Sequence, residues 1–169
     1  MTPRAALELL SALGASPWLV RHHELVLEAA TILCAQLTDL AFDRAAVLAG
    51  AALHDAGKIA HPQEMSAPGH AHEAAGRALL VARSVPASLA RFCVTHAAWD
   101  APACTFEDRL VALADKLWKG KRDAALEQRL VQDLAAATGL ESWAAFDRFD
   151  ALCERIAADG PDRLARSVI

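Results

Sequence analysis

The chain has 169 residues, which is enough for one domain with a single hydrophobic core. Alanine and leucine dominate, tyrosine is absent and β-branched residues are few, which predicts helices throughout. The net charge of -4 argues against a dedicated nucleic-acid-binding protein, because such proteins normally carry a basic face, but it is compatible with a small phosphorylated ligand.

The predicted elements are helices that follow one another with short gaps. Ser, Thr or Asp caps, often followed by Pro, mark the helix starts, and Gly marks several ends. In chain order the predicted helices span about residues 3–14, 17–37, 44–57, 70–84, 86–98, 106–118, 122–137 and 142–158. There is no strand alternation, repeat or interdomain linker, so the expected fold is all-α, a single-domain bundle of six to eight helices over residues 1–169.

Two segments differ from this regular pattern. Residues 58–68 form the longest irregular connection, and polar loops beside a rigid scaffold are favoured places for binding sites. Residues 123–169 contain no motif that we can interpret. Their pattern predicts helices that pack on the motif-bearing core of residues 16–122, and one of them could form a homodimer face or a lid.

Targeting and redox signals are weak. The N-terminus lacks the basic start and cleavage site of a signal peptide, and the longest apolar stretch, residues 45–53, is too short to span a bilayer. The cysteines form no CxxC pair, which argues against a zinc knuckle or a disulfide framework. We therefore expect a cytoplasmic protein with reduced thiols and no membrane partner.

The stretch AALHDAGK, residues 51–58, places a histidine and an aspartate side by side in a helix of small apolar residues. His54 shares a helical stripe with Val47 and Ala51, while Asp55 falls on the neighbouring stripe. The two side chains can face one object only if it lies between these stripes. A metal ion or a pair of ions suits that arrangement, because imidazole binds end-on and carboxylates can bridge.

Other ionisable groups interrupt apolar faces elsewhere. His72, His96 and Asp115 each lie on a different predicted helix. A single histidine in such a place is more often a core residue bonded to a backbone carbonyl, but several such groups together favour a metal site, because a buried carboxylate must be paired, hydrogen-bonded or coordinated. In the second predicted helix, His22 and His23 lie equally far from the polar side, so the helical wheel does not choose between them.

These residues resemble the HD superfamily of metal-dependent phosphohydrolases, whose pattern is an early His, a His-Asp doublet and a late Asp. The matching segments are RHHELVLEAA, AALHDAGK and LVALADK, and the resemblance spans about residues 16–122. Family members typically have Val four residues after the first His and a small residue eight residues after it. His22, followed by Val26 and Ala30, fits this pattern better than His23.

The resemblance extends to the binuclear branch of the superfamily, in which one further His opens an HExxG-like segment and another lies on the next helix. His72 in HEAAG and His96 match these positions. The resemblance implies that Asp55 bridges two divalent transition metals, usually iron or manganese, and that the full set of ligands is His22, His54, Asp55, His72, His96 and Asp115. Such a pair would produce a metal-bound hydroxide that cleaves a phosphoester or phosphoanhydride bond.

Within the superfamily the chain is most similar to the small bacterial hydrolases of dinucleoside polyphosphates such as diadenosine tetraphosphate. The shared features are its size, the HEAAG step and the segment ALADKLWKGKR. A chain without tyrosine cannot carry the Gly-Tyr-Pro signature of cyclic-di-GMP phosphodiesterases, and the Glu-Asp step of the alarmone hydrolases is missing. The implied partner is a small phosphorylated substrate of the nucleotide type.

Basic residues near the expected site are candidates for substrate contacts. Lys58 follows the doublet and, with Asp55, is an expected catalytic residue that binds a phosphate. Lys119 and Arg122 could bind further phosphates, and the planar guanidinium suits that task. Each of these cations is also typical of a solvated helix end.

Aromatic and loop residues are weaker candidates. Trp99 or Trp118 could stack on a base, although a large aromatic at helical spacing is more often part of the core. His61 and His70 flank the irregular loop and are left out of the predicted site, because loop histidines are commonly inert.

Two rival functions share much of this pattern. Some HD-fold proteins with the same ligands are mixed-valent diiron oxygenases, which tend to add a substrate-gating tyrosine or glutamate. Others are non-catalytic signalling modules, which usually lose ligands. The absence of tyrosine argues against the oxygenase, and the complete ligand pattern argues against the module.

Overall fold

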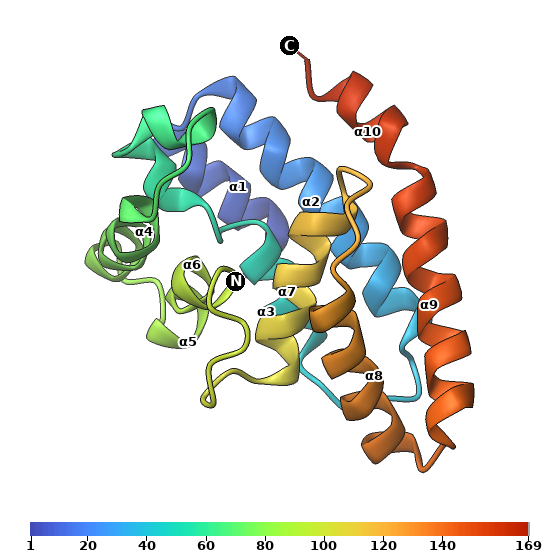
Figure 1. The fold of residues 1–169 in the computed structure, drawn as a ribbon. Coiled ribbons are helices and arrows are strands. Elements are labelled where there is room, and N and C mark those ends of the chain that lie inside the picture. The colour runs from blue at the N-terminus through green and yellow to red at the C-terminus, as the bar shows by residue number, and fades with distance from the viewer. Residues whose placement is uncertain (169) are drawn as a thin grey trace.

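The computed structural model describes residues 1–168, and within that range the chain is all-helical, as expected (Figure 1). Eight of the α-helices have at least seven residues. The α-helices are α1 (Pro3–Ala12), α2 (Pro17–Gln36), α3 (Arg44–Ala51), α4 (Ala71–Ala82), α5 (Ala87–Ala90), α6 (Phe92–Thr95), α7 (Phe106–Leu117), α8 (Ala124–Thr138), α9 (Ser142–Ala158) and α10 (Gly160–Arg166). Two 3-10 helices, η1 (Ala56–Ile59) and η2 (Pro62–Met65), occupy most of the irregular connection.

Side-chain caps begin several helices where the sequence predicts them. Thr2, Ser16 and Asp43 each accept a hydrogen bond from a backbone N–H in the first turn that follows. Thr105 and Asp108 form a complete capping box at the start of α7. Each such cap stabilises its helix by about 0.5–2 kcal/mol. The start points of these helices are therefore encoded locally.

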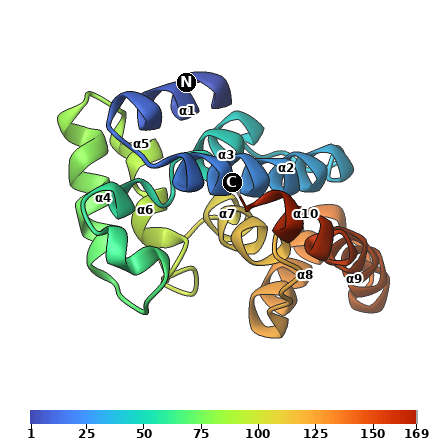
Figure 2. The same ribbon diagram turned by 90° about the horizontal axis from the view of Figure 1, so that it is seen from above.

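The helices form three groups around a shared core. Seen from above, α2, α3 and α7 lie in the middle, with α4, α5 and α6 on one side and α8, α9 and α10 on the other (Figure 2). The main hydrophobic cluster joins buried side chains of α2 and α7 with those of α8 and α9. The middle helices therefore lie where side chains from both flanks can converge.

The third helix ends earlier than expected, because the doublet leaves the α-helical hydrogen-bond pattern. α3 ends at Ala51, and the His-Asp pair lies in the turn before η1. In a continued helix the N–H of Asp55 would bond to the carbonyl of Ala51. Instead, that carbonyl accepts a bond from Nδ1 of His54 at 3.0 Å, and the Asp55 N–H donates to Nε2 of His23 at 3.2 Å. The expectation that both residues lie on neighbouring stripes of one α-helix is wrong.

Two further segments differ from the sequence prediction. The helix expected over residues 86–98 is two single turns, α5 and α6, joined at Arg91, whose own φ of -60° and ψ of -30° are helical. The short helix α10 was not predicted. Its Arg163 is buried, donates to the carboxylate of Glu28 on α2 at 2.9 Å and to the carbonyl of Ile156 at 2.7 Å, and so fastens the C-terminal helix to the core.

Close packing of two glycines brings the doublet to α4. A Cβ at Gly57 would meet the backbone of His72 and Gly76, and a Cβ at Gly76 would meet the backbone nitrogen of Gly57. Glycine at both positions therefore lets η1 approach α4 more closely than any side chain would allow. From the sequence, Gly57 was predicted only to end the third helix, and its contact with α4 was not expected.

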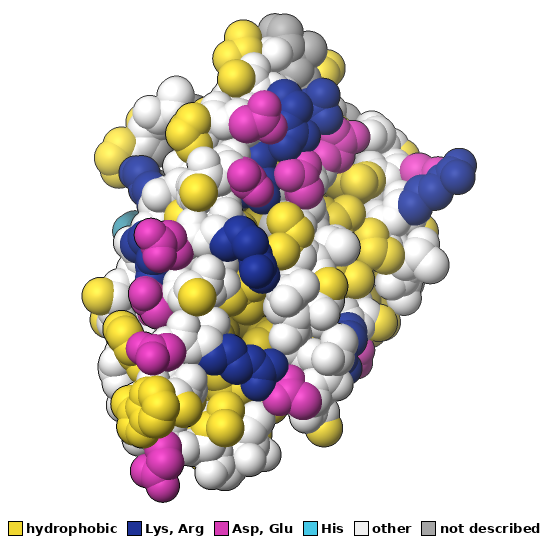
Figure 3. Space-filling view, turned by 90° about the vertical axis from the view of Figure 1, so that its right-hand side faces the viewer, with side chains coloured by type: hydrophobic (Ala, Val, Ile, Leu, Met, Phe, Trp, Pro, Cys, Tyr) yellow, Lys and Arg dark blue, Asp and Glu magenta, His cyan; other side chains and the backbone are white. Residues whose placement is uncertain are grey.

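The outer surface over the C-terminal helices is mixed in character. Basic and acidic side chains lie beside one another on the side that carries α9, with hydrophobic side chains between them (Figure 3). Within residues 1–168, no helix combines the length and the apolar character needed to cross a membrane.

Candidate metal centre

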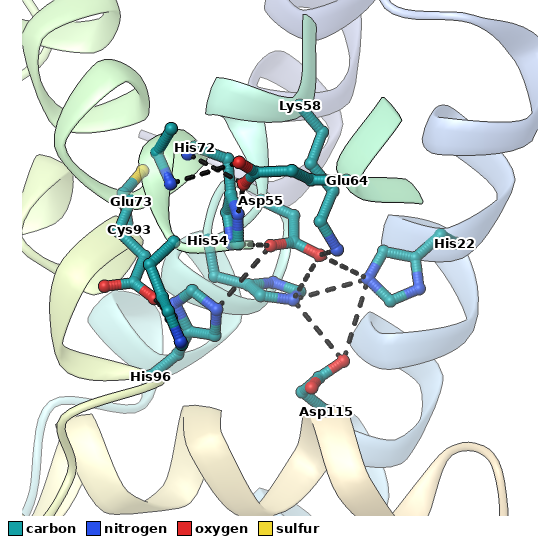
Figure 4. Close-up of polar contacts among 12 residues, drawn as sticks. His22, His54, Asp55, Lys58, Glu64, His72, Glu73, Cys93, His96 and Asp115 are labelled. Carbon is teal, nitrogen blue, oxygen red and sulfur yellow. Dashed lines mark hydrogen bonds and ion pairs between the residues drawn. The ribbon is translucent and has the colours of Figure 1, made fainter. Parts of the chain in front are cut away.

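Two clusters of histidine and aspartate lie side by side in the middle of the fold (Figure 4). In each cluster, one nitrogen or oxygen from every residue lies within 4.8 Å of the others. We call them the first group and the second group; the first consists of His22, His54 and Asp115, and the second of Asp55, His72 and His96. The structure thus brings together all the residues that the sequence analysis names as metal ligands.

Different elements supply the two groups. α2 supplies His22 and α7 supplies Asp115, while the doublet comes from the turn between α3 and η1. α4 supplies His72, and His96 directly follows α6. Because these segments are far apart in the sequence, the convergence depends on tertiary packing rather than on any local motif.

Asp55 lies between the two groups and faces both. Its Oδ2 is 3.2 Å from Nε2 of His22 and 3.6 Å from Nε2 of His54. Its Oδ1 is 3.2 Å from Nε2 of His72 and 3.5 Å from Nε2 of His96. Each carboxylate oxygen therefore faces one group, which is the geometry expected of a carboxylate that bridges two cations.

Hydrogen bonds at the far side of each ring fix the tautomers of three histidines. Nδ1 of His54 contacts the carbonyl of Ala51 and Nδ1 of His96 contacts that of Phe92, both at 3.0 Å. Nδ1 of His72 lies 2.6 Å from a carboxylate oxygen. Because carbonyl and carboxylate oxygens can only accept, Nδ1 carries a proton in each ring, and the neutral form of each ring therefore directs the lone pair of Nε2 into the site.

The converging acceptors fit a metal. Oδ1 of Asp55 is buried and has no hydrogen-bond partner among residues 1–168. Nε2 of His22 and Nε2 of His54 face each other at 3.4 Å. Buried acceptors in this arrangement repel one another unless protons or a cation lie between them. Imidazole nitrogens and carboxylate oxygens are the ligands that iron, manganese and zinc accept.

The pKa values show how the carboxylates and the imidazoles depend on each other. Burial opposes the charge on His54, but the carboxylates of Asp55 and Asp115 raise its pKa above the ordinary value. The nearby Asp55 carboxylate raises the pKa of His72, whereas burial lowers that of His96 to about 4. Burial would raise the pKa of Asp55, yet the charge on His54 and bonds from other histidines hold it well below its usual range. The carboxylates therefore favour a proton on His54 and on His72, which a bound cation would displace.

The comparison with protein families matches residues 19–119 to the HD domain. The chain belongs to the HD domain family. Membership implies the family of metal-dependent phosphohydrolases, and the matched range contains both groups of the candidate centre. Neither a comparison with curated proteins nor one with solved structures finds a match.

Within this HD domain, the two neighbouring histidines of α2 have different surroundings. His22 points into the first group, whereas Nδ1 of His23 donates to the carbonyl of Leu19 at 2.8 Å and its Nε2 accepts the N–H of Asp55. Both nitrogens of His23 are thus used by the backbone. The helical wheel could not distinguish the two residues because both are buried. They differ in their contact with the turn after α3, where the N–H of Asp55 bonds to His23.

Glu64 is a site residue that the sequence analysis missed. Its Oε2 accepts from Nδ1 of His72 at 2.6 Å and from the N–H of the same residue at 3.0 Å, and Oε1 accepts from the N–H of Ala71 at 3.2 Å. The hydrogen bond from His72 lowers the pKa of Glu64, which keeps the carboxylate charged. A carboxylate behind a metal-ligating histidine orients the ring and raises its basicity. The one available signal was its position in the irregular connection.

The predicted cations fall into two classes. Nζ of Lys58 lies 2.6 Å from Oδ2 of Asp55, and Nζ of Lys119 lies 3.5 Å from Oδ2 of Asp115. Arg122 instead bonds to Glu127 and Asp150 on the C-terminal helices, with donor–acceptor distances of 2.6–2.8 Å. The two lysines therefore lie at the centre, whereas Arg122 is paired with carboxylates of the C-terminal helices.

The remaining candidates are placed as follows. Trp118 is buried, 5% exposed, with its ring edge-on to His22 at 5.2 Å, and Trp99 packs partly buried against the main core. Both therefore agree with the alternative that these tryptophans belong to the core. His70 is exposed and pairs with Glu73 rather than with either group.

Proposed function

We propose that this HD domain is a phosphohydrolase that acts on a nucleotide-type substrate with two divalent transition metals, iron or manganese. The position of Asp55 carries this proposal, because its two oxygens face two separate sets of ligands. A single-metal site would use only one of these sets. Two metals a few ångströms apart are the arrangement that enzymes use for displacement at phosphorus.

Each residue has a distinct role in the proposed reaction. The first group would hold one metal and the second group the other, with Asp55 shared between them. When bound, the two metals would lower the pKa of a water molecule and offset the charge that builds up on the phosphoryl oxygens. The backbone bonds on His54 and His96 keep their Nε2 atoms directed inward, so the ligands need little reorganisation.

The lysines beside the two groups supply positive charge for the substrate. Lys58 contacts the carboxylate of Asp55, and Lys119 contacts that of Asp115. A phosphate bound to metals at these carboxylates would therefore lie close to both ammonium groups. We propose Lys58 as the catalytic cation and Lys119 as a second phosphate contact. Arg122 is not included, because its guanidinium is already paired with two carboxylates.

The resemblance to dinucleoside polyphosphate hydrolases supports the substrate class. An extended chain of phosphates would use more than one cation, and the segment after Asp115 supplies Lys119 and Lys121. We therefore propose a dinucleoside polyphosphate such as diadenosine tetraphosphate as the first compound to test, followed by mononucleotides and cyclic nucleotides.

Product release with defined metal content tests this function. The protein would be purified without metal, loaded anaerobically with Mn²⁺ or Fe²⁺ and incubated with the panel. Asp55→Asn is the blank, and Asp147→Asn, an exposed carboxylate on α9, is the matched control. We expect release by wild type and by D147N and none by D55N. A protein that binds two metals, releases no product and consumes oxygen in air would be an oxygenase instead of a hydrolase. A protein that binds no metal and is inactive would be a binding module.

A further inference from the structure

The candidate centre opens to solvent on one side. Side chains of the two groups are less than a tenth exposed, except that of Asp115, which is 22% exposed. Lys119, next to Asp115, is 29% exposed. The most accessible part of the centre therefore lies at the C-terminal end of α7, which is where a ligand from solvent would meet it first.

Two tryptophans flank His22, whose Nε2 lies 3.7 Å from the partly exposed Asp115 carboxylate. The ring of Trp18, one turn before His22 on α2, lies nearly parallel to the imidazole, with 6.2 Å between centroids and 12° between planes. The ring of Trp118 meets the same imidazole edge-on at 5.2 Å. Trp118 is buried, whereas Trp18 is 38% exposed. Trp18 therefore rests on a predicted metal ligand and still presents aromatic surface to solvent.

We propose that Trp18 is the stacking residue for a planar ring of the substrate, so that this HD domain selects phosphorylated compounds that carry a nucleobase. The inference rests on the proposed function for the phosphate but adds a residue outside the ligand set and the predicted cations. The bases of nucleotides stack on an indole face regardless of their sequence or type. The stacking role that the sequence analysis considered for Trp99 or Trp118 thereby falls to a residue it did not single out.

Charge near the opening agrees with a nucleotide rather than with an apolar ligand. The ammonium of Lys119 lies 5.8 Å from the centroid of the Trp118 ring and 3.5 Å from the Asp115 carboxylate. The opening therefore combines a cation for a phosphate with an exposed indole for a ring. Trp143, which is 70% exposed on α9, has no such neighbours among the histidines and serves as the control tryptophan.

A pair of ligands that differ only in the base separates stacking from phosphate binding. Adenosine 5′-monophosphate and ribose 5-phosphate share the phosphoester and the sugar, and their dissociation constants would be measured by equilibrium dialysis with the Mn²⁺-loaded protein. Wild type should bind the nucleotide about 5- to 100-fold more tightly, because a stacked base contributes that much. Trp18→Leu, which keeps apolar contact with His22 but has no π face, should bring the ratio close to one.

Three controls make the result specific. Trp18→Phe should keep most of the preference, Trp143→Leu should keep all of it, and bound manganese should be equal in all variants. Equal affinities of wild type for the two ligands, or a ratio unaffected by W18L, would overturn the proposal. Hydrolysis is scored separately with the same protein preparations on the whole substrate panel, so a protein that shows the Trp18-dependent preference but releases product from no compound would retain this inference and lose the proposed function.

Discussion

The backbone N–H of Asp55 donates to Nε2 of His23 at 3.2 Å, across 32 residues of sequence. This bond takes the N–H out of the α-helical pattern and turns the His-Asp doublet so that both side chains face the same centre. His23 can accept it because its Nδ1 donates to the carbonyl of Leu19 at 2.8 Å, which leaves Nε2 unprotonated. A histidine that binds no metal in our proposal thus sets the backbone of two residues that do.

Replacing His23 tests this role. His23→Phe keeps the aromatic bulk but leaves the buried N–H of Asp55 without a partner, which should lower the free energy of unfolding by about 1–3 kcal/mol. His23→Gln can accept the same bond through its amide oxygen and should recover a large part of the loss. Urea unfolding measures stability, and elemental analysis measures bound metal. Metal contents that are equal in H23F and H23Q would contradict the positioning role.

Glu64 gives a second prediction that concerns only one group of ligands. Glu64→Gln removes the negative charge behind His72, and loss of such an outer carboxylate typically lowers metal affinity by about 10–100-fold. We expect this loss at the second group, with little change at the first. The matched control is Glu73→Gln, since Glu73 pairs with the exposed His70. Stepwise Mn²⁺ titration resolves the two affinities, and an equal loss at both would show that Glu64 acts on general stability.

The sequence predicted those features that depend on local interactions. Thr2, Ser16 and Thr105 cap helices as expected, because a cap needs only a few neighbouring residues. The six residues predicted as metal ligands lie together in the structure, and they could be named from the sequence because the spacing of His and Asp resembles that of a known family.

The features that the sequence did not predict depend on contacts between distant segments. The turn at Asp55 requires His23, and the role of Glu64 requires that η2 fold back onto the start of α4. Arg122 lies in a basic run, yet its guanidinium is bonded to carboxylates of α8 and α9. No pattern within a single helix shows which of several buried or charged residues will meet such a partner.

The third prediction concerns pH. The carboxylates of the centre raise the pKa values of His54 and His72, so below those values the metal-free protein holds protons that a metal must displace. Apparent metal affinity should therefore rise with pH, by about tenfold per pH unit for each displaced proton, and level off once both rings are neutral. Calorimetric titration of metal into the metal-free protein at about pH 6.5, in two buffers of different ionisation enthalpy, should show net proton release on binding. Equal heats in both buffers would mean that the two rings are already neutral.

The last prediction links the glycine contact between η1 and α4 to metal binding. In Gly57→Ala the new Cβ would meet the backbone of His72 and Gly76, which cannot turn away as a side chain could. η1 must then move from α4, which separates Asp55 from His72 and should destabilise the protein by about 1–3 kcal/mol.

Gly139→Ala is the matched control for this change. Gly139 has a φ of 71°, so alanine there is strained, but its Cβ would have no neighbour within 4 Å. Both variants should unfold at lower urea concentration, whereas only G57A should lose metal from the second group. If G57A bound the full amount of metal, the two glycines would serve packing alone, and the distance from η1 to α4 would not control the candidate centre.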